Sequence, residues 1–263
     1  MAKRAKNASL AISLVAIDAS GNVLSNDVFT TTAAGPVAKF SGTYSNPDGA
    51  AMVSVIYPAF TNGDGTEAVP WSCAKKVLFD MKLGKQFINI STYGPHFQDM
   101  NADPAFLSQA VVMRGKISDM SAFLSGTALT TLKNTCYIVK TTVTLPPTVS
   151  AVSEVSLKTS SSSITAHGWT VLDDRFMSYY GGTSAEELRK IRTRLDGFVP
   201  ASDRTVTAWM IGYGADRFEV KSGETLTMSV ITDDGYFSRD KPLASDIIFE
   251  PGKIYRLTVD MTK

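Results

Sequence analysis

The stretch that decides the fold reads Tyr137-Ile-Val-Lys-Thr-Thr-Val-Thr-Leu-Pro-Pro147. The side chains expected to share one face are Tyr137, Val139, Thr141, Val143 and Leu145. Because neighbouring side chains of a strand point to opposite faces, this period of two predicts a strand that buries one face in a core. Proline lacks a backbone N–H, so Pro146 and Pro147 end the strand.

The same alternation recurs in short segments along the chain, at 10–17, 52–57, 76–79, 86–90, 155–158, 205–211, 225–230 and 253–261. The segment 205–211 is apolar on both faces towards its end, which predicts a central strand. The stretches 18–22 and 233–235 have the Asp and Gly residues of tight turns. Many short strands joined by such turns predict an all-β protein built from sandwich domains.

Helix signals are few, and they predict one or two short helices. Ser184 and Glu187 have the spacing of a capping box. The apolar stripe that follows them consists of Leu188, Ile191 and Leu195, which predicts a helix over 184–195. A second helix is expected over 103–113, with Asp103 as its cap and Pro104 at its first helical position.

The length of the chain, 263 residues, predicts two domains. Two domains of about 130 residues each fall within the usual size range. An irregular stretch at 114–126 separates two regions of regular alternation. We therefore expect an N-terminal β-sandwich domain over 1–128 and a C-terminal one over 129–263.

Composition excludes several classes of function. Hydrophobic residues make up 44% of the chain and charged residues 19%, which indicates packed cores. The 26 basic and 25 acidic residues give a net charge of +1, so no basic excess exists to neutralise phosphates, and nucleic acid is not an expected partner. No apolar run reaches the roughly 20 residues that span a bilayer as a helix.

The N-terminal stretch Met1-Ala-Lys-Arg-Ala-Lys-Asn7 is basic, but no apolar segment follows it. This pattern is typical of a cytoplasmic protein, or of a secreted one whose signal peptide is absent from the sequence. The low charge and the abundance of Ser, Thr and Gly favour export. Cys73 and Cys136 could pair in an oxidising compartment. We favour two separately buried thiols, because free cysteine behaves as a small core hydrophobe.

Catalytic patterns are missing from the sequence. Its two histidines, His96 and His167, are interpreted as ordinary residues of a loop and a strand edge. The pairs 173–174 and 233–234 are read as turn residues, because consecutive aspartates point apart. The loop 62–67 lacks the ligand ladder and the terminal glutamate of a calcium loop. We expect no enzyme, and no catalytic, cofactor or metal site.

Two segments could contact a ligand. The basic residues of the expected helix 184–195 would suit anionic sugars, lipids or a partner protein, although a solvated helix face has the same composition. Phe176, Tyr179 and Tyr180 are expected in a loop, where exposed aromatic rings would suit sugar or protein recognition. Packing of that loop against the domain explains the same residues equally well.

Several stretches resemble the fimbrillin family. They are Leu132–Lys140 running into Thr144-Leu-Pro146, Ile231–Tyr236, Lys241-Pro-Leu243, Phe249–Val259 and, more loosely, Val55-Ile-Tyr-Pro58. The resemblance covers the second half of the chain best and the first half by architecture. Fimbrillins are subunits or anchors of type V pili and related adhesins on anaerobic Gram-negative cells.

The resemblance implies two transthyretin-like β-sandwich domains in tandem, export as a lipoprotein precursor to the cell outer membrane, and trimming after an arginine. This trimming removes an N-terminal strand, and a strand from the next subunit then fills the groove that the removed strand occupied. Arg4 is the candidate processing site, since it is the sole arginine before Arg114. The candidate assembly strands carry Leu10, Ile12 and Leu14 at one end of the chain and Tyr255, Leu257, Val259 and Met261 at the other.

The sequence thus leads to two hypotheses. The first is a structural or adhesive pilus (fimbrium) subunit at the cell surface that assembles with other pilus subunits by strand exchange, with a host glycan or protein as an optional ligand. The alternative is a monomeric surface module that binds a carbohydrate or protein through loops such as 173–182.

Overall fold

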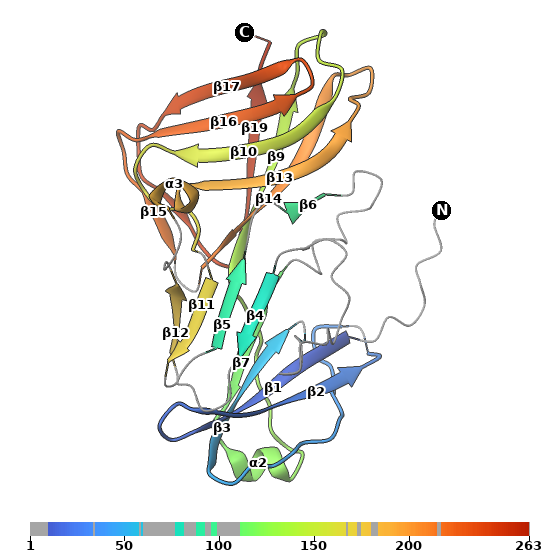
Figure 1. Ribbon diagram of the computed structural model, residues 1–263, viewed down its shortest axis with the longest axis vertical. Helices are drawn as coiled ribbons and strands as arrows, with labels where there is room; N and C mark the ends of the chain where they lie inside the picture. Colours follow the sequence, from blue (N-terminus) through green and yellow to red (C-terminus); the bar gives the residue numbers. More distant parts are fainter. Residues whose placement is uncertain are drawn as a thin grey trace.

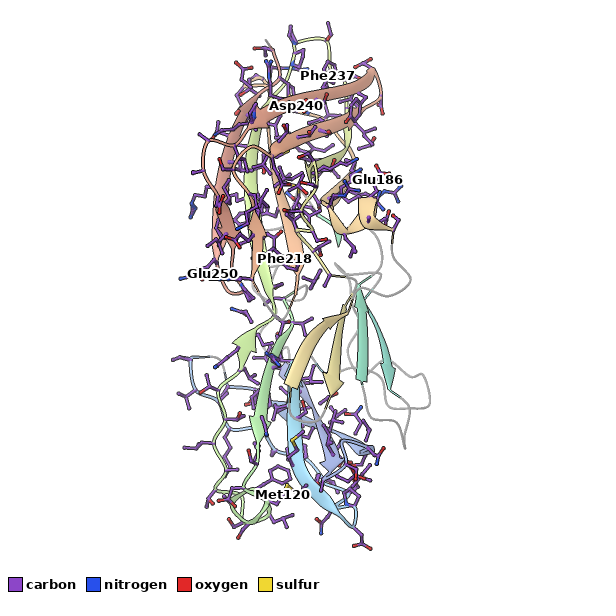
Figure 2. The ribbon with its side chains drawn as sticks, turned by 90° about the vertical axis from the view of Figure 1, so that its left-hand side faces the viewer. Met120, Glu186, Phe218, Phe237, Asp240 and Glu250 are labelled. Atoms are coloured by element: carbon purple, nitrogen blue, oxygen red, sulfur yellow. The ribbon has the colours of Figure 1, made fainter. Side chains whose placement is uncertain are left out.

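The structure is a computed structural model, and it describes residues 10–33, 35–57, 59, 77–81, 88–92, 96–98, 111–166, 168–172, 175–179, 184–214 and 217–262. Strands dominate this part of the chain, together with two short helices. Figure 1 shows an elongated molecule with two lobes and a smaller sheet between them. In Figure 2, Met120 lies at the tip of the lower lobe, whereas Phe237 and Asp240 lie far from it on the upper lobe. The all-β class is confirmed.

The lower lobe contains a five-stranded sheet in the order β2-β1-β3-β7-β8. Its strands are β1 (Leu10–Asp18), β2 (Val23–Thr31), β3 (Ala50–Tyr57), β7 (Met113–Ile117) and β8 (Lys133–Asn134). One face forms a core of Ile12, Leu14, Val53, Val55 and Ile117. Helix α2 (Met120–Leu124) packs at this core and is capped by the Asp119 side chain, which accepts from Ala122 N at 2.9 Å.

The hairpin turn predicted between β1 and β2 is confirmed. The Asp18 carboxylate accepts from the backbone N–H groups of Ser20 at 2.8 Å and Asn22 at 2.7 Å. Gly21 has a φ of 86°, a conformation that a glycine adopts without steric cost.

β1 lies between β2 and β3, and it is buried on both faces. The prediction of a strand that is apolar on one face only is therefore wrong here. Ser13, which belongs to the expected outer face, has no exposed surface. Alanine and serine are small enough to be buried against a second layer, so their presence did not indicate a solvent-facing side.

The upper lobe has two facing sheets around one core. The first sheet has the order β17-β16-β10-β13-β6, and the second has the order β14-β9-β19. Their strands are β6 (His96–Phe97), β9 (Cys136–Thr144), β10 (Val152–Thr159), β13 (Lys190–Phe198), β14 (Thr205–Tyr213), β16 (Thr225–Thr232), β17 (Gly235–Pro242) and β19 (Ile254–Asp260). A short pair, β15 (Phe218–Val220) with β18 (Ile247–Phe249), completes the lobe.

Tyr137 on β9 organises this core. Its ring stacks on Phe249, with 4.7 Å between centroids and an interplanar angle of 16°, and its hydroxyl donates to the carbonyl of Ile164. A Cβ at Gly212 would lie 2.2 Å from the Tyr137 ring, so only glycine fits opposite it on β14. The alternation predicted for 137–145 is confirmed, since Val139, Val143 and Leu145 are buried.

The helix predicted over 184–195 is wrong beyond its first turn. Helix α3 (Ala185–Leu188) begins as expected, with the Ser184 hydroxyl accepting from Glu187 N at 3.2 Å. The chain then enters β13, which buries Ile191 and Leu195. These two positions are four apart, so they lie on one face of a helix and also on one face of a strand. Pairing with β10 selects the strand.

A four-stranded sheet in the order β12-β11-β5-β4 lies between the lobes. Its strands are β4 (Val77–Met81), β5 (Ile88–Thr92), β11 (Gly168–Leu172) and β12 (Arg175–Tyr179). Two pairings, β5 with β11 and β6 with β13, join strands from either side of residue 128. The domain division at 128 stays a prediction.

Three further predictions are corrected by the described residues. His96 lies in β6, paired with β13, rather than in a loop. Phe176 and Tyr179 lie in β12, because this segment pairs along its whole length with β11. Met113 begins β7 rather than ending a helix, and most of the helix expected over 103–113 lies outside the described residues. Also outside them are Tyr180, His167 and the segments 62–67 and 173–174.

Candidate assembly edge

The three-stranded sheet of the upper lobe has two outer strands, β14 and β19. β9 lies between them and pairs antiparallel with β14 and parallel with β19. The central position predicted for 205–211 is therefore wrong, because β14 stands at an edge of this sheet. An outer strand directs every second pair of backbone N–H and C=O groups away from its sheet, and these groups need partners or water.

The bonding pattern shows which residues of β14 face outward. Leu145 N donates to Arg204 O at 2.9 Å, and Gly214 N donates to Thr135 O at 3.0 Å. In an antiparallel ladder, residues that bond to the partner alternate with residues that do not. The even-numbered residues of β14 thus bond to β9, and the backbone groups of Thr205, Thr207, Trp209, Ile211 and Tyr213 face outward.

Gln98 closes the middle of this edge. Its Nε2 donates to Thr207 O at 2.7 Å, and its Oε1 accepts from Trp209 N at 2.8 Å. Its own backbone N donates to Arg194 O of β13 at 3.0 Å, and only 8% of the residue is exposed. A primary amide has the donor and acceptor of a peptide group. Gln98 therefore replaces one residue of a neighbouring strand, and it joins the two sheets of the lobe.

The two ends of the β14 edge are also closed. At one end, Tyr213 N donates to the Thr165 hydroxyl at 3.1 Å, and Ala166 N donates to Tyr213 O at 2.6 Å. At the other end, Thr205 N donates to the Asp203 carboxylate at 3.1 Å. These contacts leave a strand from another chain few groups with which to pair.

The β19 edge differs. Lys253 O accepts from Ile138 N at 3.0 Å, and Met261 N donates to Thr144 O at 2.9 Å, so the odd-numbered residues bond to β9. The even-numbered residues of β19 face outward, and within the described part of the chain no strand pairs with them. At the far end the Arg239 guanidinium donates to Asp260 O at 3.4 Å. Ile254, at the near end, is 52% exposed.

The candidate residues on β19 lie together on the core side, as predicted. Tyr255, Leu257 and Val259 are partly buried against the core of their own lobe, and Met261 is buried. The Tyr255 ring meets Phe249 edge to face, with 4.9 Å between centroids. β19 thus offers an open edge while its side chains hold it in place.

The N-terminal candidates lie elsewhere. Leu10, Ile12 and Leu14 belong to β1 in the lower lobe, which is paired on both sides. Figure 1 shows β1 and β19 in different lobes, so the structure does not bring the two candidate strands together. Arg4 lies outside the described residues. The role of Leu10, Ile12, Leu14 and Arg4 in assembly stays a prediction.

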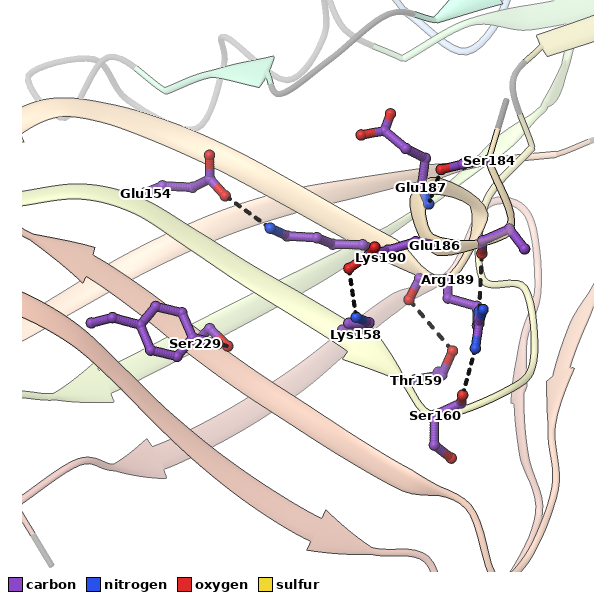
Figure 3. A network of polar contacts seen from close by, with 12 residues as sticks. Glu154, Lys158, Thr159, Ser160, Ser184, Glu186, Glu187, Arg189, Lys190 and Ser229 are labelled. Carbon is purple, nitrogen blue, oxygen red and sulfur yellow. Dashed lines mark hydrogen bonds and ion pairs between the residues drawn. The ribbon is translucent and has the colours of Figure 1, made fainter. Parts of the chain in front are cut away.

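Of the basic residues predicted as a ligand contact, Lys190 and Arg192 lie in β13 and are paired with acids, whereas Arg189 donates to backbone carbonyls (Figure 3). Lys158 Nζ lies 2.8 Å from Glu186 Oε1, and Lys190 Nζ lies 3.4 Å from Glu154 Oε1. The hydrogen bond from Lys158 lowers the pKa of Glu186. These pairs agree with the interpretation of a solvated charged face.

Glu224 anchors the loop around Ser161 and Ser162, which leads to Thr165, the residue that closes the β14 edge at Tyr213. Its carboxylate accepts from Ser161 N at 3.1 Å, Ser162 N at 2.8 Å and Lys221 N at 3.1 Å, and it also bonds the Ser162 hydroxyl. Desolvation alone would raise the pKa of this carboxyl, but the hydrogen bonds outweigh it and lower the pKa to about 2. Glu224 is thus ionised at neutral pH.

Cys136 is a free, buried thiol, as predicted for it. Burial raises its pKa to about 12, so the thiol stays protonated. Cys73 lies outside the described residues. Within the described residues, no three His, Cys, Asp or Glu side chains are grouped to hold a metal ion. No helix in the same part of the chain is long and apolar enough to cross a membrane.

No family model matches this sequence, and no curated protein matches it. Among solved structures, it is similar to a candidate cell adhesion protein from Bacteroides uniformis, with 14% identity, 97% of this chain and 88% of that chain covered, and a TM-score of 0.46. A second candidate cell adhesion protein, from Bacteroides ovatus, has 14% identity, coverages of 97% and 83%, and a TM-score of 0.43. The fimbrial anchor protein Mfa2 from Porphyromonas gingivalis has 11% identity, coverages of 89% and 74%, and a TM-score of 0.38. Membership of the fimbrillin family stays a resemblance.

Proposed function

We propose that this chain is a structural or adhesive subunit of a cell-surface fimbrium, and that it joins a neighbouring subunit by adding a strand along the β19 edge. The observation that supports this most is the difference between two edges of one sheet. Side chains of Gln98, Thr165 and Asp203 close β14, whereas no strand among the described residues pairs with the outward backbone groups of β19, of which Asp260 O accepts from Arg239.

Strand addition fits the chemistry of the β19 edge. An added strand would bond the outward N–H and C=O groups of Ile254, Arg256 and Thr258, and main-chain bonds of this kind give β-augmentation its affinity. The exposed Ile254 side chain would be covered at the same time, so apolar burial would add to the hydrogen bonds. A long unpaired edge is otherwise a liability, because it also pairs with unrelated chains.

The finer parts of the proposal come from the fimbrillin resemblance. They are transthyretin-like domains, a lipoprotein precursor at the outer membrane, trimming after Arg4, and donation of a terminal strand to another pilus subunit. A role without catalysis belongs to the same proposal. Replacing both His96 and His167 with alanine should leave assembly unchanged. If the wild-type chain had a hydrolytic activity that this variant lost while keeping its fold, a role without catalysis would be contradicted.

The β19 edge can be tested by removing one outward N–H. Proline at position 256 removes a donor that does not bond to β9, and proline is tolerated at edges for this reason. We expect Arg256→Pro to prevent subunit association, while Arg256→Ala, which keeps the N–H, should associate normally. Light scattering coupled to size exclusion after mild trypsin treatment measures association, and thermal melting checks that both variants fold.

Equal association of the two variants would show that the β19 edge is not used. If the wild-type chain stays monomeric at every concentration, before and after trypsin, the alternative of a monomeric binding module is favoured. The exposed ring of Tyr236, 64% accessible and bonded through its hydroxyl to Ser229 at 2.7 Å, would suit such a module as a sugar-stacking surface. A glycan array with a Tyr236→Ala control measures that activity.

A further inference from the structure

The outward backbone groups of β19 are arranged so that the strand can pair with a second copy of itself. Arg256 and Thr258 are exposed, and neither bonds a described residue through its outward N–H or C=O. An antiparallel neighbour pairs with such an edge by exchanging two hydrogen bonds between residues that directly face each other. Because every outward residue of β19 has an even number, two copies match when their two-fold axis passes through a residue.

Three residues near the middle of the strand could lie on that axis, and the chemistry favours one of them. An axis at Arg256 would place two arginines directly opposite each other, and like charges in this position are destabilising. An axis at Thr258 would depend on Asp260 O, which already accepts from Arg239. An axis at Leu257 avoids both problems, because its central pairs join Arg256 of one copy to Thr258 of the other.

The inward face of β19 suits the same axis. Tyr255, Leu257 and Val259 are only partly buried against the core of their own lobe. An axis at Leu257 brings the two Leu257 side chains together in a non-hydrogen-bonded pair, the kind in which side chains are closest. Tyr255 of one copy would face Val259 of the other, so apolar contact would continue from one core into the next. Ile254, which is 52% exposed, would be covered by the end of the other strand.

We propose that two copies of this chain pair through β19, antiparallel and about an axis at Leu257, and so join their three-stranded sheets into one. This pairing rests on the proposed function, since it names the neighbour whose strand is added along the β19 edge. It needs neither trimming of the chain nor donation of a terminal segment. A two-fold contact uses the same surface of both copies and closes on itself, so the untreated chain should form dimers through this edge.

Position 258 tests the register, because its exposed side chain would lie opposite Arg256 of the other copy. Thr258→Glu would place an acid against each of those arginines, and Thr258→Lys would place a base there. We expect the first variant to dimerise about fivefold more tightly than the wild type and the second about fivefold more weakly. Sedimentation equilibrium of the untreated full chain measures the dimer dissociation constant, and thermal melting checks that both variants fold.

A combined variant completes this test. Arg256→Glu with Thr258→Lys reverses the charges of each pair, and it should dimerise as tightly as Thr258→Glu alone. Equal losses for Thr258→Glu and Thr258→Lys would indicate an axis at Thr258 and overturn the proposal. Wild-type affinity in both single variants would also overturn it, because position 258 would then not face Arg256.

A disulfide provides an independent check of the axis. Facing residues of a non-hydrogen-bonded pair have Cα atoms about 4.5 Å apart, which a disulfide can span. Under mild oxidation, Leu257→Cys should therefore form a dimer linked through position 257 of both chains, identified by peptide mass spectrometry. Val259→Cys is the matched control, since it would face Tyr255 and should not link to itself. Linkage through position 259, or none through position 257, would overturn the proposed axis.

The association of these variants separates self-pairing from the proposed function. If Arg256→Pro prevents association but the two changes at Thr258 have no opposite effects, a different strand uses the β19 edge; self-pairing then fails and the proposed function stands. A wild-type chain that associates only after trypsin treatment has the same meaning. If Arg256→Pro associates as well as Arg256→Ala does, the edge is not used and both proposals fail.

Discussion

The two edges of the sheet β14-β9-β19 differ, because one is closed by hydrogen-bonding groups and the other is open. The β14 edge is closed by single groups of Gln98, Thr165 and Asp203, chief among them the amide of Gln98. The β19 edge has no such closure among the described residues beyond the long contact from Arg239 to Asp260 O. The comparison teaches that a few side chains can close an edge without a further strand. A few side chains could close the β19 edge in the same way, so its open state is a feature of this sequence and not a requirement of the fold.

The largest expected effect concerns the inward face of β19. Leu257→Asp with Val259→Asp should destabilise the chain by about 3 kcal/mol or more, because it removes apolar burial and places charge against a core. The outward changes Thr258→Asp and Arg256→Ala should stay within about 0.5 kcal/mol. Urea unfolding of the monomer measures both pairs.

Two results of that experiment separate the readings of β19. If the inward variant unfolds as an isolated monomer, the strand belongs to its own core. If it melts normally but fails to enter pili, the strand is donated to another subunit. Equal behaviour of the inward and outward pairs in both assays would remove β19 from the assembly model.

A second prediction opens the closed edge. Gln98→Met keeps the approximate shape of the side chain but removes the amide, leaving Thr207 O and Trp209 N without these partners. Unpaired buried groups of this kind cost about 1–3 kcal/mol. We expect that loss in urea unfolding, together with self-association through β14 measured by light scattering. Thr258→Val is the control, and a Gln98→Met chain as stable and monomeric as the wild type would show that Gln98 does not guard the edge.

The smallest expected effect is on pH dependence, at the end of the β14 edge near Tyr213. Glu224 has a pKa lowered from 4.5 to about 2 in the folded chain, so it contributes stability above pH 4.5 and loses that contribution as the pH falls towards 2. Glu224→Gln should flatten the stability profile in this range, measured by thermal melting. Asp233, a turn aspartate, offers Asp233→Asn as a control. A profile unchanged by Glu224→Gln would mean that the carboxylate does not anchor the loop before Thr165.

Local patterns predicted much of this fold, because they report on which side of a strand is buried. The inward sets of β9, β16 and β19 follow directly from their alternation. The cap at Ser184 was also predictable, since a capping box depends on residues three apart. The helix over 190–195 was not excluded by sequence, because positions 191 and 195 satisfy both periods, and only the neighbouring strand β10 decides between them.

The candidate site was predictable only in part. The face of β19 could be read from the sequence, but the contrast between its edge and that of β14 could not. Gln98 acts on residues 109 and 111 positions away, and a lone glutamine carries no local signal of that role. The burial of both faces of β1 was missed for a related reason, because it depends on neighbours and not on its own pattern.

The parallel pairing of β19 with β9 has a consequence for the order in which the chain acquires structure. Synthesis proceeds from the N-terminus, so β9 must wait for β19, the last of the described strands, before its second side is covered. The β1–β2 hairpin, by contrast, closes over a short turn and can form early. A nascent chain of this protein would therefore keep its upper lobe incomplete until β19 has been synthesised.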